Sequence, residues 1–105
     1  MVDGRIPLDD ESFDCVISGQ CLEHVRNPFK VVAEGARILK KGGYMLLTAP
    51  NEWRIHRYPI DTFRYNPDGM AALMEEAGLT TVKTYINKND CWGIGVKPSV
   101  KPEKI

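Results

Sequence analysis

Short apolar runs alternate with amphipathic segments along the chain, and this alternation predicts strands and helices in turn. Asparagine followed by proline favours a helix start, because asparagine is a good N-cap and proline suits the first helical position. Such pairs stand at residues 27–28 and 66–67, and we expect helices over 28–40 and 67–77. The first helix shows one apolar stripe, at Phe29, Val32, Ala33, Ala36 and Leu39. Gly42 and Gly78 are expected to end the two helices.

Four short segments have the pattern of strands, at residues 13–18, 44–49, 79–86 and 91–96. The segment 44–49 is nearly all apolar and is typical of a strand buried on both faces. Residues 87–90 form a turn cluster between the last two strands. The resulting order, β-α-β-loop-α-β-β, predicts an α/β sheet that is parallel except at its end.

Composition and charge narrow the class of protein. The chain has 105 residues, enough for one domain, with 43% hydrophobic and 27% charged residues. Fourteen basic residues balance fourteen acidic ones, which argues against a partner that is nucleic acid or an anionic membrane. No apolar run approaches the length of a membrane span, and the first ten residues lack the apolar region of a signal peptide.

The cysteines and histidines are few. Cys15, Cys21 and Cys91 form no C-x-x-C pair, and their odd number indicates reduced thiols in a cytoplasmic protein. We expect Cys15 and Cys21 to be buried apolar fillers rather than nucleophiles. With only two histidines, we expect no metal site.

Four segments, in order and at fitting distances, carry a resemblance to a known family: DGRIPLDDESFD (3–14), QCLEHVRNP (20–28), EGARILKKGG (34–43) and TAPN (48–51). Together they resemble the C-terminal half of class I S-adenosylmethionine-dependent methyltransferases, in the type 11 branch. The resemblance covers about residues 3–86.

The resemblance implies a partial Rossmann-like methyltransferase sheet, with the family's strands 4-5-7-6 side by side and the last strand antiparallel. Both helices would lie on one face, because strand–helix–strand crossovers are right-handed. Residues 1–97 would form a truncated methyltransferase domain and 98–105 a flexible tail. In the family, a glycine-rich loop and an acidic residue hold the cofactor, and this chain has neither a G-x-G-x-x-G motif nor the strands that would precede it.

The implied cofactor-binding residues are Asp3, Gly4, Ser18 and Gln20. Asp3 and Gly4 match the corner that contacts the adenine amino group, and the alternative is a solvated N-terminus. Gln20 would lie beside the transferring methyl, and His24 is a candidate general base. Ubiquinone-biosynthesis O-methyltransferases are similar here and have a Glu-x-x-Glu-His metal site, but Gln20 replaces its first glutamate. A polar connection and a packing histidine are the alternatives.

The segment 51–65 is too long for a simple strand-to-helix connection and is rich in aromatic and charged residues. By resemblance it lines the acceptor side, through Asn51, His56, Arg57, Tyr58, Asp61 and Arg64. The arginines favour an acceptor that carries a carboxylate, a phosphate or a sugar-linked charge. The alternative is a small local core fixed by an Asp61–Arg64 ion pair. Glu34 and Arg37 predict a local ion pair on the first helix.

The resemblance therefore implies an enzyme that transfers a methyl group from S-adenosylmethionine to a small acceptor not identified by the sequence. Methyl transfer is a displacement that depends on alignment and needs no enzyme nucleophile. The alternatives are a non-catalytic binding or assembly module and one half of a split methyltransferase. With both helices on one face, the other face of the sheet would be bare, so we expect a homodimer or a complementing chain as partner.

Overall fold

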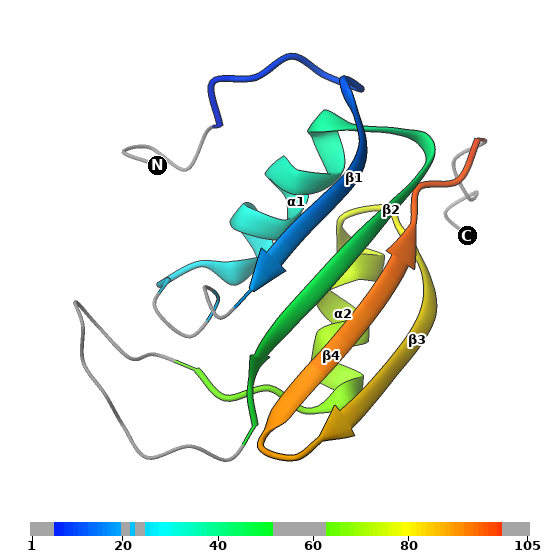
Figure 1. The fold of residues 1–105 in the computed structure, drawn as a ribbon. Coiled ribbons are helices and arrows are strands. Elements are labelled where there is room, and N and C mark those ends of the chain that lie inside the picture. Colours follow the sequence, from blue (N-terminus) through cyan, green and yellow to red (C-terminus); the bar gives the residue numbers. More distant parts are fainter. Residues whose placement is uncertain (1–5, 20–21, 23–24, 52–62, 100–105) are drawn as a thin grey trace.

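The computed structural model describes residues 6–19, 22, 25–51 and 63–99. The elements follow in the order β1 (Phe13–Gly19), α1 (Pro28–Ile38), β2 (Leu39–Pro50), α2 (Pro67–Glu76), β3 (Thr80–Asn87) and β4 (Asp90–Val96). The sheet order is β1-β2-β4-β3, with β1 and β2 parallel and β4 antiparallel to both of its neighbours. Both helices lie on the same face of this sheet (Figure 1). The predicted α/β class, strand order and placement of the helices are confirmed.

Both helices begin at the predicted prolines, but only one of them has the predicted cap. The Asn27 side chain accepts a hydrogen bond from the Lys30 backbone N–H at 3.2 Å, as an N-cap should. Asn66 makes no such bond to α2. Its Oδ1 instead accepts from Asn51 Nδ2 at 2.8 Å, so this asparagine serves the connection from β2 rather than the helix.

The end of α1 differs from the prediction. The helix ends at Ile38 rather than at residue 40, and Leu39 is already extended. Gly42 does not end the helix. Instead, Lys97 Nζ, at the end of β4, donates to the carbonyls of Ala36 and Leu39 at 2.9 Å each. A cation at a helix C-terminus also interacts favourably with the helix dipole. A lysine far along the chain therefore caps the end of α1.

Strand β2 begins five residues earlier than predicted, because an irregular stretch joins its two parts. The register between β1 and β2 shifts between Phe13 and Cys15. Gly42 has a φ of 81°, a conformation that favours glycine. Its backbone N–H donates to the Lys97 carbonyl at 2.7 Å, and Lys97 N–H donates to the Gly43 carbonyl at 3.0 Å. These bonds continue the pairing of β2 with the end of β4.

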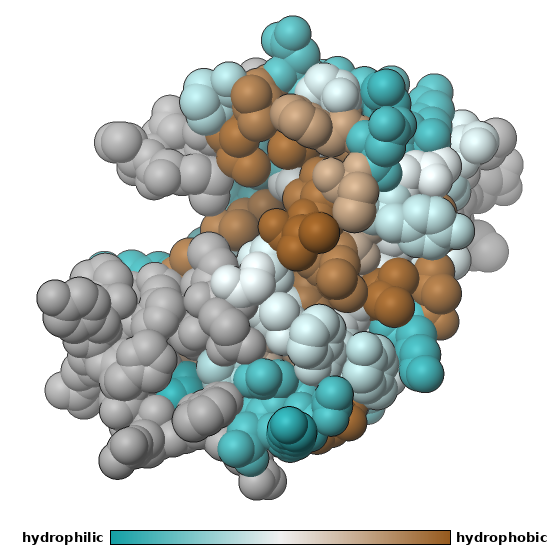
Figure 2. All heavy atoms as spheres, in the orientation of Figure 1, coloured by the Kyte–Doolittle hydropathy of each residue, from teal (hydrophilic) through white to brown (hydrophobic). Residues whose placement is uncertain are grey.

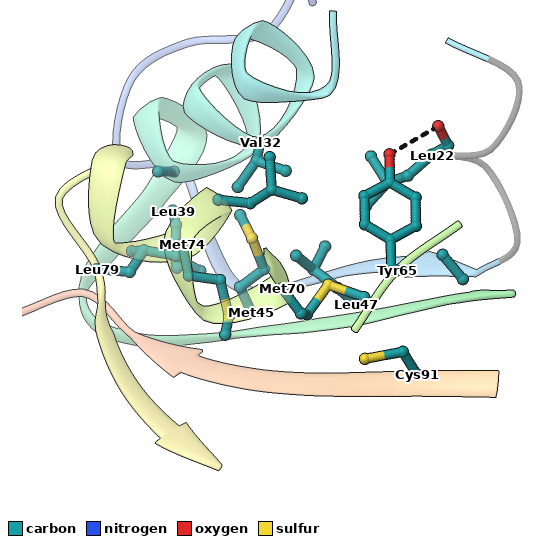
Figure 3. Packing of buried hydrophobic residues seen from close by; sticks show 13 residues of the cluster. Leu22, Val32, Leu39, Met45, Leu47, Tyr65, Met70, Met74, Leu79 and Cys91 are labelled. Atoms are coloured by element: carbon teal, nitrogen blue, oxygen red, sulfur yellow. Dashed lines mark hydrogen bonds between the residues drawn. The ribbon is translucent and has the colours of Figure 1, made fainter. Parts of the chain in front are cut away.

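The core lies between the helices and the sheet, and methionines fill its centre (Figure 3). Met70 and Met74 of α2 are fully buried. They pack where β4 carries Gly93 and Gly95: a Cβ on Gly93 would lie 2.6 Å from Met70 Cγ. The two glycines therefore let α2 approach the sheet closely.

The opposite face of the sheet, which we call the open face, has no helix over it in the described part of the chain (Figure 1). In β2 the alternate residues Met45, Leu47 and Ala49 are buried under the helices, whereas Tyr44 is 53% exposed and Leu46 is half-buried. The expectation that this strand is buried on both faces is therefore wrong for the chain as described. Its other side contributes to the apolar band in the middle of the surface in Figure 2.

Candidate functional site at the carboxyl edge of the sheet

The carboxyl ends of β1 and β2 lie at one edge of the sheet because these two strands are parallel. Both strand-to-helix connections leave from this edge, one after Gly19 and one after Pro50 (Figure 1). Ligands of open α/β sheets bind outside the carboxyl ends of the strands. The edge is therefore the candidate site, and it is where the sequence placed most of its candidate residues.

A buried tyrosine ties the two connections together. Tyr65, at the end of the second connection, is 6% exposed. Its hydroxyl donates to the carbonyl of Leu22, in the first connection, at 3.0 Å (Figure 3). Leu22 is itself fully buried. This bond joins residues 43 positions apart and fixes the separation of the two segments that border the site.

Asn51 fixes the second connection at its base. Its side-chain Nδ2 donates to the Tyr65 carbonyl at 2.7 Å and to Asn66 Oδ1 at 2.8 Å. Its backbone N–H donates to the Asn89 carbonyl, in the β3–β4 turn, at 2.7 Å. Since both amide N–H groups are used within the chain, Asn51 closes the base of the segment.

Two further candidate residues fall within the described chain. Ser18 is half-buried and pairs with the buried Leu47, which puts its side chain on the helix side of the sheet. Arg64 is half-buried, and its guanidinium donates to the Phe63 carbonyl at 3.1 Å. The remaining candidates lie outside the described residues: Asp3, Gly4, Gln20, His24, His56, Arg57, Tyr58 and Asp61.

The predicted Glu34–Arg37 ion pair is confirmed, with Arg37 Nε 2.7 Å from Glu34 Oε2. The pair also does more than the local pattern indicated. The Arg37 guanidinium donates to the carbonyls of Ile6 and Leu8, at 2.8 and 2.9 Å, and to Asp10 Oδ1 at 2.6 Å. The two carboxylates raise the pKa of Arg37 above its ordinary value, chiefly through the hydrogen bond to Glu34, so it stays charged.

Glu34 completes this clasp by accepting the Ile6 backbone N–H at 2.9 Å. The segment before β1 is thereby fastened along α1, and backbone bonds from Glu11 and Ser12 to the end of the helix extend the attachment. The sequence pattern could not indicate this role. An acidic and a basic residue three positions apart already predict a pair within the helix, and the spacing gives no sign of further partners near the N-terminus.

The cysteines are only partly as predicted. Cys15 is exposed on β1, so the expectation that it is a buried filler is wrong. Cys91 is fully buried, and burial raises the pKa of its thiol above the ordinary value. Cys91 is thus a packed, neutral side chain. Cys21 lies outside the described residues.

Other kinds of site find little support in the described part of the chain. There, no group of three or more histidine, cysteine or acidic side chains could hold a metal ion. Within the same residues, no helix is long and apolar enough to cross a membrane. A shallow groove between α1 and α2 is lined by Phe29, Lys30, Ala33, Ala72 and their neighbours. It is open to solvent, and its polar lining consists of the helix cap Asn27 and the side chains of Lys30 and Glu76.

Two described residues at the carboxyl edge, Gly19 and Asn51, do not contribute to a cradle for a nucleoside cofactor. Gly19, where a backbone cradle could start, has ordinary surroundings: an added Cβ would meet Thr48 Cγ2 at 3.8 Å. The amide donors of Asn51 are directed at the chain itself. Among the described residues of this edge, Gly19 therefore forms no tight backbone cradle and the Asn51 amide is not directed at a ligand.

Comparisons with known proteins agree with this partial architecture. Residues 2–47 match the family model described as a methyltransferase domain. Over 84 residues, the chain is 30% identical to a protein of Mycobacterium tuberculosis named as a probable S-adenosylmethionine-dependent methyltransferase. This match covers 74% of this chain and 31% of that protein. A ubiquinone biosynthesis O-methyltransferase of Maricaulis maris is 27% identical over 92 residues, or 36% of its length. The chain thus spans about a third of these curated relatives.

Solved structures give the same result for the fold. A SAM-dependent methyltransferase of Thermotoga maritima matches 90% of this chain and 60% of its own, with a TM-score of 0.71 and 24% identity. The [4+2]-cyclase SpnF matches 90% of this chain and 53% of its own, with a TM-score of 0.75 and 15% identity. The sequence and structural matches confirm the resemblance to class I S-adenosylmethionine-dependent methyltransferases, and the chain carries part of that domain.

Proposed function

We propose that this chain is the acceptor-side part of a domain that transfers a methyl group from S-adenosylmethionine to a small acceptor. The observation that carries the proposal is the Tyr65–Leu22 bond, which holds together the two connections that leave the carboxyl edge. It is supported by relatives whose names state dependence on S-adenosylmethionine. In this proposal the two connections align the acceptor and exclude water.

The proposal assigns roles to the candidates from the sequence. Asp3, Gly4, Ser18 and Gln20 would border the cofactor, and Gln20 and His24 would lie nearest the reacting methyl. The acceptor would contact His56, Arg57, Tyr58, Asp61 and Arg64. Asn51 would contribute less to acceptor binding, because its side-chain N–H groups already donate to Tyr65 and Asn66. The rest of the cofactor site would come from residues outside the described ones or from a complementing chain.

A second candidate is a non-catalytic binding or assembly module. The match to a [4+2]-cyclase shows only that proteins with this fold do not all have one activity. Another structural match is a methyltransferase of Haloferax volcanii in complex with a methyltransferase activator, which supports a partner chain for either candidate.

The proposal also includes the bounds of the domain and the cellular location of the protein. Residues 1–97 would form the methyltransferase part and 98–105 a tail. A cytoplasmic location is supported by the free thiols of Cys15 and Cys91.

Calorimetric titration with S-adenosylhomocysteine tests the assignment of the cofactor side. We expect the isolated chain to give no saturable heat, with a Kd weaker than about 1 mM, because its sequence has no G-x-G-x-x-G motif to hold the cofactor. A full-length methyltransferase titrated in parallel is the positive control. Tight binding at a ratio of one to one would contradict the partial-site proposal and would indicate a complete enzyme.

Replacing Arg57 and Arg64 by alanine tests the acceptor side. If these arginines face an acceptor, the double variant should melt within about 2 °C of the parent, since side chains that serve a ligand rather than the core contribute little to stability. Thermal unfolding followed by circular dichroism measures this. A large fall in the melting temperature would instead favour the local core fixed by an Asp61–Arg64 ion pair.

A further inference from the structure

The segment before β1 runs along α1 in the direction opposite to the helix. The backbone N–H groups of Glu11 and Ser12 donate to carbonyls in the last turn of α1, at 2.9 and 2.8 Å. Earlier in the chain, the Ile6 N–H donates to Glu34 Oε1 at 2.9 Å, one turn further back along the helix. Figure 1 shows this segment in dark blue beside α1. Followed from β1 back to Ile6, the segment therefore heads toward the start of α1.

Arg37 and Glu34 together form the clasp that fixes this direction. The Arg37 guanidinium donates to the carbonyls of Ile6 and Leu8 and to the carboxylate of Asp10, at 2.8, 2.9 and 2.6 Å. Its Nε donates to Glu34 at 2.7 Å, so one planar fork joins backbone carbonyls to carboxylates. The Arg37 and Glu34 side chains are only 18% and 14% exposed. The clasp is therefore largely shielded from water and is stronger than a surface ion pair.

The direction matters because α1 starts at the carboxyl edge, where the connection from β1 enters the helix. From Glu34 back to Pro28 the helix covers about 9 Å, at about 1.5 Å per residue. From Ile6 back to Asp3 an extended chain covers up to about 10 Å. Asp3 and Gly4, which the proposed function puts beside the cofactor, are therefore within reach of that edge.

We propose that Arg37 and Glu34 are positioning residues of the carboxyl-edge site, which direct the chain ahead of Ile6 from the last turn of α1 toward that edge. They act through the backbone of residues 6–8 rather than by touching a cofactor or an acceptor. The inference rests on the proposed function for the role of Asp3, whereas the direction of the segment does not. The alternative is an ion pair that only stabilises the helix, which would not need the bonds to the carbonyls of residues 6 and 8.

Hydrogen exchange of the Ile6 amide, followed by nuclear magnetic resonance, tests the clasp without any cofactor. Arg37→Gln should speed this exchange about tenfold or more, because hydrogen bonds to charged groups contribute that much to an opening equilibrium. Arg37→Lys should restore little of the protection, since an ammonium group cannot reproduce the planar fork. Lys40→Gln is the matched control: it removes the exposed Lys40–Asp14 pair, at 3.6 Å just beyond α1, and should leave the Ile6 exchange unchanged.

A spin label tests the direction of the chain. Arg5→Cys would carry the label, in a background where Cys15 and Cys21 are replaced by serine. The remaining cysteine, Cys91, is fully buried, so the label would be confined to one site. Signal broadening by the label falls steeply with distance and therefore reports which edge of the sheet the segment approaches.

In the labelled parent, the amide of Leu22 at the carboxyl edge should broaden more than that of Gly42 at the opposite edge. Arg37→Gln should remove this difference, and Lys40→Gln should keep it. Glu34→Ala, which removes the acceptor of the Ile6 N–H, provides a second variant in case Arg37→Gln does not fold, and it should behave in the same way.

Unchanged Ile6 exchange in Arg37→Gln and Glu34→Ala would overturn the proposal, as would full protection in Arg37→Lys, which would leave a role of charge alone. Equal broadening of Leu22 and Gly42 in the labelled parent would overturn it as well. Neither readout uses a cofactor, so these failures are distinguishable from a failure of the proposed function, which the titration with S-adenosylhomocysteine decides.

Discussion

Replacement of Gly43 by alanine should lower the free energy of unfolding by about 3 kcal/mol, and with it the melting temperature by roughly 10–20 °C. A Cβ at this position would lie 2.8 Å from the carbonyl oxygens of Asp14 and Lys40 and 2.7 Å from Leu39 Cδ1. The oxygens belong to the backbone and cannot turn aside as a flexible side chain can. Relief would require β1 and the irregular part of β2 to separate, which would disturb their pairing.

Gly69→Ala is the matched control for this change. Gly69 lies in α2 with no neighbouring atom within 4 Å of an added Cβ, so alanine there should raise stability by up to about 1 kcal/mol. Chemical denaturation of both variants measures the difference. If Gly43→Ala were as stable as the parent, the close approach of β1 to the start of β2 would be contradicted.

Tyr65→Ala should cost about 3–5 kcal/mol, whereas Tyr65→Phe should cost about 1–2 kcal/mol. Alanine removes a buried ring from the core, and phenylalanine removes only the hydroxyl and leaves the buried Leu22 carbonyl without this donor. The difference between the two variants therefore separates packing from the bond that joins the two connections. Urea denaturation of each variant provides the values.

Tyr44→Phe controls for the loss of a hydroxyl as such. Tyr44 is 53% exposed on the open face, so its phenylalanine variant should lie within about 0.5 kcal/mol of the parent. Equal stability of Tyr65→Phe and Tyr44→Phe would mean that the bond to Leu22 does not hold the edge together, and the proposed alignment of the two connections would lose its support.

The hydrophobic pattern predicted the helices and strands well, and the resemblance supplied the strand order. Both helices start at the predicted prolines because local chemistry decides a helix start. The start of β2 was missed, because residues 40–43 have no apolar periodicity and their pairing depends on bonds to Lys97, more than fifty residues later. The end of α1 was missed for the same reason.

The candidate site was predicted in outline, as the carboxyl edge of two parallel strands. Its internal supports were not. The Tyr65 hydroxyl and the Arg37 guanidinium donate to backbone carbonyls. Because every residue has a backbone carbonyl, the sequence does not show which of them serve as acceptors. Asn51 was predicted to contact an acceptor, but its amide is used to close the base of its own segment. Residue type and spacing therefore located the edge but could not distinguish side chains that support it from those that would face a ligand.

The most direct test of the account is nuclear magnetic resonance of the isotope-labelled chain titrated with S-adenosylhomocysteine to about 5 mM, where even weak contacts shift amide signals. The account predicts small, non-saturating shifts confined to the carboxyl edge, including the amides of Ser18, Gly19, Leu22 and Asn51. Shifts that centre on the groove between α1 and α2, or on the open face, would contradict the placement of the site. Saturable shifts at submillimolar ligand would contradict the proposal that this chain holds only part of the cofactor site.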